Sequence, residues 1–213
     1  MDKNAQFVID KRVERTIENF KKHNMDAYCI KDKISLINKI SEILEDGNTV
    51  AVGGSMTLFE TGVIDFLRNG NYKFLDRYKE GLTSEGIKNV FRESFSADAY
   101  LVSSNAITEE GELYNVDGNG NRVAAMLYGP DKVIVVVSYN KIVKNIDEAI
   151  KRNREISAPA NCVRLSRKTP CTEVGYCMDC KSPDRICNDY VVIKRQGVKG
   201  RIHILILEGD YGY

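Results

Sequence analysis

Along the chain, segments with apolar residues at helical spacing alternate with short apolar runs that are typical of strands. Residues 10–23 carry Val13, Ile17 and Phe20 at helical spacing among charged residues, which predicts an exposed amphipathic helix. Short apolar runs predict strands at AYCI, TVAV, KFLD, AYLV and VIVVV, and helical periods separate them at ISLINKISEILEDG, SEGIKNVFRESFS and IDEAIKRNREIS. This alternation predicts a layered α/β fold with a mainly parallel sheet flanked by helices.

Turn and cap residues refine this pattern. The helix ISLINKISEILEDG is expected to be closed by Gly47, SEGIKNVFRESFS to be capped by Ser84, and SMTLFETGVIDFLRNG to form a broken helix. The segment AITEEGELYNVDGNGN alternates around Gly111 and predicts a β-hairpin. The last two strands, YVVIKR and RIHILILEG, are predicted to pair across QGVKG.

Residues 158–189 interrupt the pattern. They contain three of the four prolines and show no apolar period. A structureless stretch of that length inside a compact domain is usually functional. We therefore expect a single domain over residues 1–213, with a cysteine-rich metal-binding loop at residues 158–189 before the C-terminal strands.

Four of the six cysteines gather in this loop at the spacing C-x5-C-x2-C-x6-C, as Cys171, Cys177, Cys180 and Cys187. Thiolates are soft ligands, so an iron–sulfur cluster or zinc is favoured over a hard cation. A compact run with one central C-x2-C is more typical of a 4Fe–4S cluster, whereas structural zinc sites more often have two separated pairs. Free or redox-active thiols are the third alternative. The remaining cysteines, Cys29 and Cys162, are interpreted as small buried hydrophobic residues.

The N-terminal segment MDKNAQFVIDKRVERTIENF carries charges every few residues and lacks the apolar centre of a signal peptide. Apolar runs such as VIVVV are far shorter than the ~20 residues that cross a bilayer. We therefore expect a cytoplasmic protein with reduced thiols and no membrane partner.

The net charge of +1 gives no reason to expect a nucleic-acid partner. Charge is distributed unevenly, however, because residues 163–201 hold nine basic and four acidic residues. This local excess favours an anionic ligand, cluster or partner near the cysteine loop.

The glycine-rich stretch VGGSMT follows a predicted strand and opens a helix. Its residues Gly53, Gly54, Ser55 and Thr57 would offer backbone and hydroxyl donors to an anion. The stretch is neither a Walker A motif nor a dinucleotide fingerprint. Ordinary turn and cap chemistry explains it at least as well.

Polar residues are dense in SSNAITEEGELYNVDGNGNRVAA, between two apolar strands. Loops at the carboxyl ends of parallel strands are where α/β domains bind ligands, so this stretch supplies three candidate ligand-binding residues, Asn105, Asn121 and Arg122. Turn chemistry explains the asparagines and glycines but neither Arg122 nor Glu109. With only two histidines in the chain, acid–base chemistry would fall to Glu60, Glu109 or Asp117.

The segments VAVGGSMTLFETG, ADAYLVSSNAITEEGELYNVDGNGNRVAAMLYGPDKVIVVV and SAPANCVRL resemble the LUD (lactate utilization) domain family, of the LutC/YkgG kind. The resemblance implies a NagB/RpiA/CoA-transferase-like fold, whose glycine-rich loops bind sugar phosphates, CoA thioesters or folates. It also implies a part in oxidising L-lactate to pyruvate, together with iron–sulfur protein partners. Chains of this kind need not carry a cysteine loop, so that loop is a departure or a subfamily trait.

Three functions are compatible with these features. The first is a redox-linked protein of L-lactate or related hydroxy-acid metabolism, with a four-cysteine iron–sulfur site. The second is a non-catalytic ligand-binding or regulatory module stapled by a structural zinc. The third is a transferase- or isomerase-like enzyme that acts on a small anionic substrate through Glu60 or Glu109. The sequence leaves open the substrate, the metal, the need for partners and the formation of a homodimer.

Overall fold

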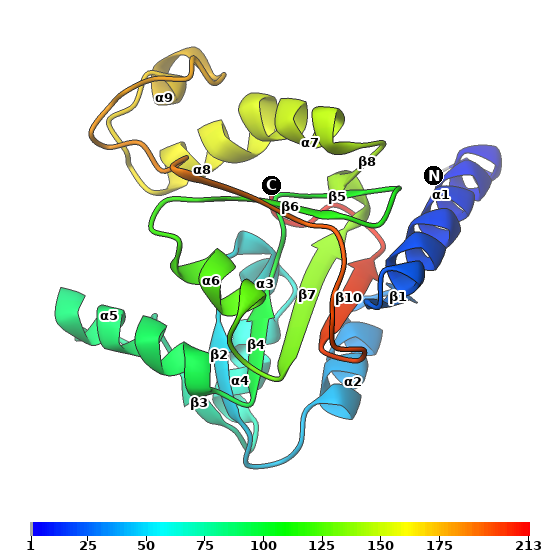
Figure 1. Ribbon diagram of the computed structural model, residues 1–213, viewed down its shortest axis with the longest axis horizontal. Helices are drawn as coiled ribbons and strands as arrows, with labels where there is room; N and C mark the ends of the chain where they lie inside the picture. The colour runs from blue at the N-terminus through cyan, green and yellow to red at the C-terminus, as the bar shows by residue number, and fades with distance from the viewer. Residues whose placement is uncertain (1) are drawn as a thin grey trace.

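Six strands form one sheet in the order β1–β10–β7–β4–β2–β3, and each neighbouring pair is parallel (Figure 1). The computed structural model describes residues 2–213. The strands are β1 (Asp26–Ile30), β2 (Thr49–Val52), β3 (Lys73–Leu75), β4 (Ala99–Val102), β7 (Lys132–Ser138) and β10 (Ile202–Leu207). The expected parallel sheet flanked by helices is therefore confirmed.

Four short strands form a second sheet in the order β8–β5–β6–β9. They are β5 (Ala106–Thr108), β6 (Leu113–Asp117), β8 (Ile142–Val143) and β9 (Asp189–Ile193). Strands β5 and β6 pair antiparallel, which confirms the predicted hairpin. Gly111 lies in its turn with φ +83°, a conformation that favours glycine.

The main sheet is covered differently on its two faces. One face packs against α2 (Lys33–Ile43), α3 (Met56–Glu60) and α4 (Val63–Asn69). The other packs against α1 (Lys3–Lys22), α6 (Asn121–Leu127) and the second sheet. Successive side chains of strand β7 point to opposite faces of the sheet. Val133, Val135 and Val137 pack on the face covered by α1, α6 and the second sheet, whereas Ile134 and Val136 pack on the face covered by α2, α3 and α4.

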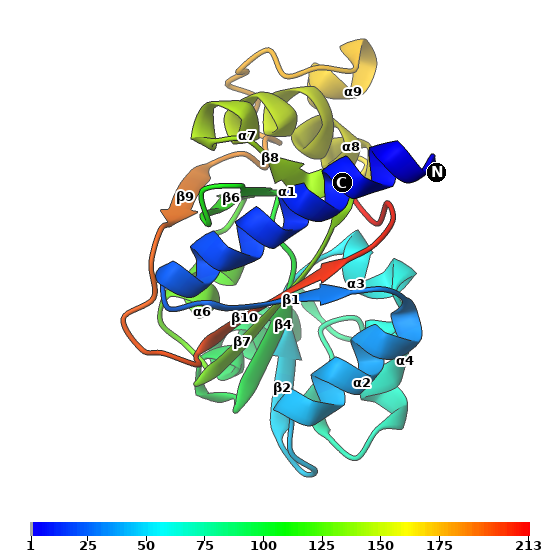
Figure 2. The ribbon, with the colours of Figure 1, turned by 90° about the vertical axis from the view of Figure 1, so that its right-hand side faces the viewer.

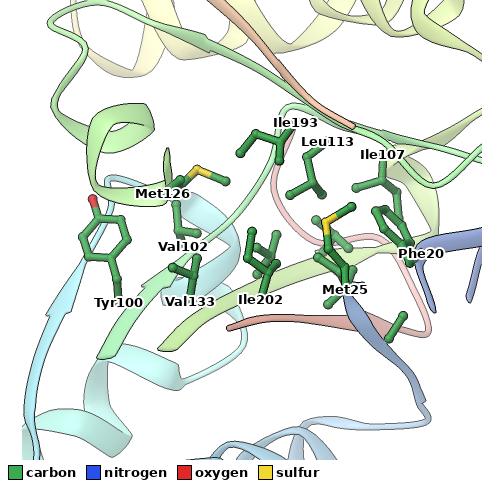
Figure 3. Packing of buried hydrophobic residues seen from close by; sticks show 14 of the residues in the cluster. Phe20, Met25, Tyr100, Val102, Ile107, Leu113, Met126, Val133, Ile193 and Ile202 are labelled. Atoms are coloured by element: carbon green, nitrogen blue, oxygen red, sulfur yellow. The ribbon is translucent and has the colours of Figure 1, made fainter. Parts of the chain in front are cut away.

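The layer between the two sheets is apolar. Side chains from α1, the second sheet and β10 meet there, among them Phe20, Leu113 and Ile202 (Figure 3). Helix α1 crosses beside the second sheet, as the side view in Figure 2 shows. This packing fixes the position of the second sheet over the carboxyl ends of the main strands.

A third layer of helices lies on the outer side of the second sheet (Figure 1). It consists of α7 (Ile146–Arg152), a π-helical turn η3 (Asn153–Ser157) and α8 (Ala158–Arg164), followed by the short α9 (Cys171–Val174). The remaining helical elements are α5 (Ser84–Glu93), η1 (Ser94–Ser96) and η2 (Tyr139–Lys141). Within residues 2–213, no helix is both long and apolar enough to cross a bilayer.

Several local predictions need correction. Strands β9 and β10 do not pair with each other, because β9 joins β6 in the second sheet while β10 lies between β1 and β7. The cap of α5 is Thr83 rather than Ser84, and α2 ends at Ile43, well before Gly47. Residues 158–189 are not structureless, since they contain α8 and α9. The broken helix after β2 is confirmed as α3 and α4.

Candidate functional site

A polar pocket of about 410 Å³ opens beside the carboxyl ends of β2 and β4. Its walls come from the loops after these strands, the turn between β6 and α6, the end of α8, and residues 183–188 of the cysteine-rich segment. In parallel α/β sheets, the carboxyl ends of strands are where ligands bind. The pocket is also within the size range of small-molecule sites.

Basic side chains dominate the pocket lining. Six line it against two acidic ones, namely Arg77, Arg122, Lys141, Arg164, Arg167 and Arg185 against Asp117 and Asp184. Three of the arginines pair with an aspartate at 3.3–3.6 Å: Arg122 with Asp117, Arg167 with Asp184, and Arg185 with Asp179. Within residues 2–213, Arg77, Lys141 and Arg164 form no ion pair. The pocket therefore has positive charge that is not paired with any carboxylate of the part of the chain that the structure describes.

Arg122 lies in the pocket floor and is 9% exposed. Its Nη1 donates to Asn115 Oδ1 at 2.6 Å and to the Ser103 carbonyl at 3.1 Å. Its Nη2 donates to Asn105 Oδ1 at 3.0 Å and to the Val116 carbonyl at 2.8 Å. Burial lowers the pKa of the guanidinium, and the nearby Asp117 carboxylate opposes that shift. These four bonds use the guanidinium mainly to hold β4 and the hairpin together.

Gly53 makes room for this arginine. A Cβ at Gly53 would lie 2.8 Å from Val102 Cγ2 and 3.1 Å from Arg122 Cγ. A side chain there would therefore displace Arg122. The first glycine of VGGSMT thus has a packing role.

Lys141 ends η2, directly after β7, and is 2% exposed. Its Nζ donates to Thr57 Oγ1 at 2.8 Å and to Ser103 Oγ at 3.1 Å. Burial, together with the positive charges of Arg152 and Arg122, lowers the pKa of this amine to about 7, and the Glu60 carboxylate opposes the shift. Near pH 7 a large share of Lys141 is therefore neutral.

Residues 211–213 lie against the same region. The Gly212 N–H donates to Glu60 Oε2 at 2.7 Å, and Ser138 Oγ donates to the Tyr211 carbonyl at 2.9 Å. Tyr213 lines the pocket. Glu60 therefore holds this segment in place and is not part of the pocket lining.

Six of the predicted pocket residues line the pocket together: Gly54, Ser55, Asn105, Asp117, Asn121 and Arg122. Thr57 lies beneath it as the partner of Lys141. Gly53 and Glu60 are placed as described above. Glu109 lies elsewhere, because its carboxylate binds Arg12 Nε at 2.7 Å and Arg15 Nη2 at 3.0 Å on α1. Its acid–base role stays a prediction that the pocket geometry does not support.

The four predicted metal ligands gather around one small cavity. This cavity of about 20 Å³ is lined by Cys171, Cys177, Cys180 and Cys187, and by Cys162 from α8. Burial raises the pKa of Cys162 to about 11 and that of Cys187 to about 12. Cys162 is buried as expected, whereas Cys29 is exposed, contrary to its predicted burial.

The thiols surround the cavity without forming a coordination shell. Within residues 2–213, no group of three or more His, Cys, Asp or Glu side chains is arranged to hold a metal ion. The soft donor set suits zinc or an iron–sulfur cluster. In the described arrangement the thiols would have to move before they could coordinate either one.

The cysteine cavity and the polar pocket share a wall. Arg185 and Ile186 line both. The Arg185 guanidinium donates to the Cys180 carbonyl and, at 2.8 Å, to the Cys187 carbonyl. The cysteine-rich segment is therefore structurally part of the pocket.

Sequence reasoning missed most of the basic lining, namely Arg77, Lys141, Arg164, Arg167 and Arg185. Lys141 could have been found, because it follows the most apolar predicted strand at its carboxyl end. Arg164, Arg167 and Arg185 were counted in the basic segment but not placed beside the glycine loop. Only the tertiary structure brings residues 164–185 next to residues 54–56.

The model of the LUD domain family matches residues 13–207, and the chain belongs to that family. Membership supports a role related to lactate utilization in general terms. A search of curated proteins finds no match.

A crystal structure of a DUF162 family protein from Deinococcus radiodurans is similar, with a TM-score of 0.54 and 17% identity over 94% of this chain and 98% of that one. This likeness extends over nearly the whole of both chains and supports the observed fold, a mainly parallel sheet flanked by helices.

Two further structures resemble part of the chain. eIF2B delta from Chaetomium thermophilum has a TM-score of 0.37 and 17% identity, over 68% of this chain and 54% of that one. Ribose 5-phosphate isomerase A from Methanocaldococcus jannaschii has a TM-score of 0.36 and 17% identity, over 67% and 66%.

We expect Arg122→Lys to lower the free energy of unfolding by roughly 2–4 kcal/mol, because a lysine cannot satisfy four buried acceptors on two sides of a planar fork. Urea unfolding measures this change. Arg164→Lys is the control, since Arg164 is exposed and donates to Asn161 Oδ1 within its own helix, so its change should stay within about 0.5 kcal/mol. Equal effects of the two variants would contradict the structural role of Arg122.

The buried amine of Lys141 should make the free energy of unfolding of the protein depend on pH. Its pKa is lowered from 10.5 to about 7 on folding, so between these values the unfolded chain binds more protons and stability rises with pH. Relative to Lys141→Met, the wild-type protein should gain up to about 1.4 kcal/mol per pH unit across this window. Urea unfolding at several pH values, with exposed Lys144→Met as control, tests this. A difference independent of pH would refute the assignment.

Proposed function

We propose that this LUD-domain protein binds a small carboxylic acid, lactate or a related hydroxy or oxo acid, in the polar pocket. The observation that carries the proposal is the presence of Arg77 and Arg164 in one pocket without ion-pair partners among the described residues. Like charges close together repel, and an anionic ligand removes that cost.

Arg77 and Arg164 differ from Arg122 because some of their N–H donors are not used by the described part of the chain. Arg77 stacks its guanidinium on Phe91, 4.5 Å from the ring centroid, and lies close to Gly54. Arg164 donates to Asn161 Oδ1 through Nε and Nη2. Both therefore keep N–H donors for a carboxylate, and such charge-assisted bonds are among the stronger ones in proteins.

The finer part of the proposal is a redox-linked role in L-lactate or hydroxy-acid metabolism. Oxidising a hydroxy acid to an oxo acid releases two electrons and two protons, so an acceptor is required. Iron–sulfur partner proteins would be such acceptors. The transferase or isomerase alternative has less support, because neither Glu60 nor Glu109 lines the pocket.

We expect L-lactate and pyruvate to raise the melting temperature of the protein, and the neutral analogue lactamide to have no effect. Arg77→Gln combined with Arg164→Gln should weaken binding tenfold or more, because each lost charge-assisted bond is worth about 1.5–3 kcal/mol. Titration calorimetry measures the affinity.

Arg195→Gln is the matched control, since Arg195 is exposed and outside the pocket lining. Unchanged affinity in the double variant, or equal binding of lactamide, would overturn the proposed site.

A second candidate function is metal binding by the cysteine segment. The observation that favours it is that the four predicted ligands and Cys162 line one cavity. With about 20 Å³, the cavity is near the size of a single water-sized sphere. A single zinc ion therefore needs smaller movements of the thiols than a four-iron cluster, and a structural zinc becomes the stronger of the two metal alternatives.

We expect protein purified without oxygen to contain about one zinc or, for a 4Fe–4S cluster, about four irons and four sulfides per chain. Elemental analysis and the absorption spectrum distinguish them. Cys177→Ser should lose most of the metal and lower the melting temperature, whereas exposed Cys29→Ser should change neither. Wild-type protein that takes up neither zinc nor iron on reconstitution would remove the metal function.

A further inference from the structure

Lys141 is a buried amine without a counter-charge. Its Nζ donates to two hydroxyl oxygens, Thr57 Oγ1 at 2.8 Å and Ser103 Oγ at 3.1 Å, and no carboxylate pairs with it within residues 2–213. Buried lysines are normally paired with an acid, because an isolated buried charge is costly. The surroundings of Lys141 therefore favour the neutral amine.

Most charged groups around Lys141 also disfavour the protonated form of its amine. Arg152 and Arg122 bring positive charge from α7 and α6, and Glu60 of α3 is the only acid that opposes them among the groups acting on this amine. Arg152 is itself buried, and its Nε and Nη1 bind the carbonyls of Asn140 and Asn105 at 2.9 and 2.6 Å. Its charge is therefore fixed in place near the amine.

The amine is also shielded and yet belongs to the pocket. Lys141 lines the polar pocket. On another side the chain packs tightly, because a Cβ at Gly212 would lie 3.3 Å from Nζ and 2.4 Å from Thr57 Oγ1. A nucleophilic lysine requires a neutral amine that is shielded from water and borders a ligand pocket, and Lys141 meets these conditions.

We propose that Lys141 condenses with the carbonyl carbon of a 2-oxo acid held in this pocket and forms an imine. This inference rests on the proposed function, since Arg77 and Arg164 would hold the carboxylate of the same ligand. A 2-hydroxy acid has no carbonyl at that carbon and binds without a covalent bond. The pocket would therefore distinguish the oxidised from the reduced acid.

The step balances without an oxidant or reductant. The Nζ lone pair forms a bond to the carbonyl carbon, and a proton moves from nitrogen to oxygen to give a carbinolamine. The second N–H proton then leaves with the hydroxyl group as water, and the C=N bond forms. Thr57 and Ser103, whose hydroxyl oxygens are 3.4 Å apart, are placed to pass these protons.

The experiment is reductive trapping of the full chain with pyruvate and cyanoborohydride, followed by intact mass and peptide mapping. We expect one adduct, on Lys141, with a rate that rises to half its maximum near pH 7, whereas exposed lysines react only at much higher pH. An excess of L-lactate should slow trapping. Lys141→Arg should abolish the adduct, and Ser103→Ala should slow it several-fold.

The controls separate this inference from the proposed function. Exposed Lys144 serves as the internal reference in the same peptide map. If calorimetry shows pyruvate binding but no adduct forms on Lys141, the imine is overturned and the anion site stands. If neither pyruvate nor lactate binds, both are overturned. Adducts spread over exposed lysines would also overturn the imine, and this outcome does not depend on whether Lys141→Arg folds.

Discussion

The buried guanidinium of Arg122 is the interaction on which the site depends. Its four hydrogen bonds join the end of β4 to the hairpin that carries the second sheet, through Asn105, Asn115 and two carbonyls. A buried charge is tolerable only when its donors are all used, so the surrounding polar groups must keep their positions. Asn105 extends the network, because its carbonyl accepts from Arg152 Nη1 at 2.6 Å. Two arginines thus set the geometry of the pocket floor.

This arrangement divides the positive charges into two kinds. Arg122 and Arg152 have their donors bound by protein acceptors, so they contribute a fixed positive potential beneath the pocket. Arg77 and Arg164, nearer solvent, keep donors for a ligand. Burial of the Lys141 amine, helped by the positive charge of this pair, lowers its pKa and keeps it partly neutral. A strongly basic pocket therefore borders a partly neutral amine, and burial in the scaffold rather than a neighbouring base produces this state.

What the sequence could predict depends on how far apart in the chain the interacting residues lie. The period of apolar residues identified the strands and the parallel sheet, and the loop after β6 was recognised because Arg122 had no explanation in turn chemistry. Nothing in the sequence indicated that Glu109 is paired, because its partners, Arg12 and Arg15, lie more than 90 residues away. The predicted pairing of β9 with β10 was wrong for a similar reason. The spacing of apolar residues identifies a strand, but it does not show which distant strand it pairs with. Lys141 was not singled out because its hydrogen-bond partners, Thr57 in α3 and Ser103 after β4, lie 84 and 38 residues away in the sequence.

The cysteine-rich segment gains its meaning from Arg185. This side chain holds the carbonyls of Cys180 and Cys187 on one side and lines the basic pocket on the other. Anything that repositions those carbonyls repositions a cation of the pocket wall. Because binding free energies at two linked sites are reciprocal, an anion bound near Arg185 would in turn favour one arrangement of the thiols. The cysteine-rich segment and the polar pocket are therefore structurally coupled, because Arg185 contacts the cysteine carbonyls and lines the pocket.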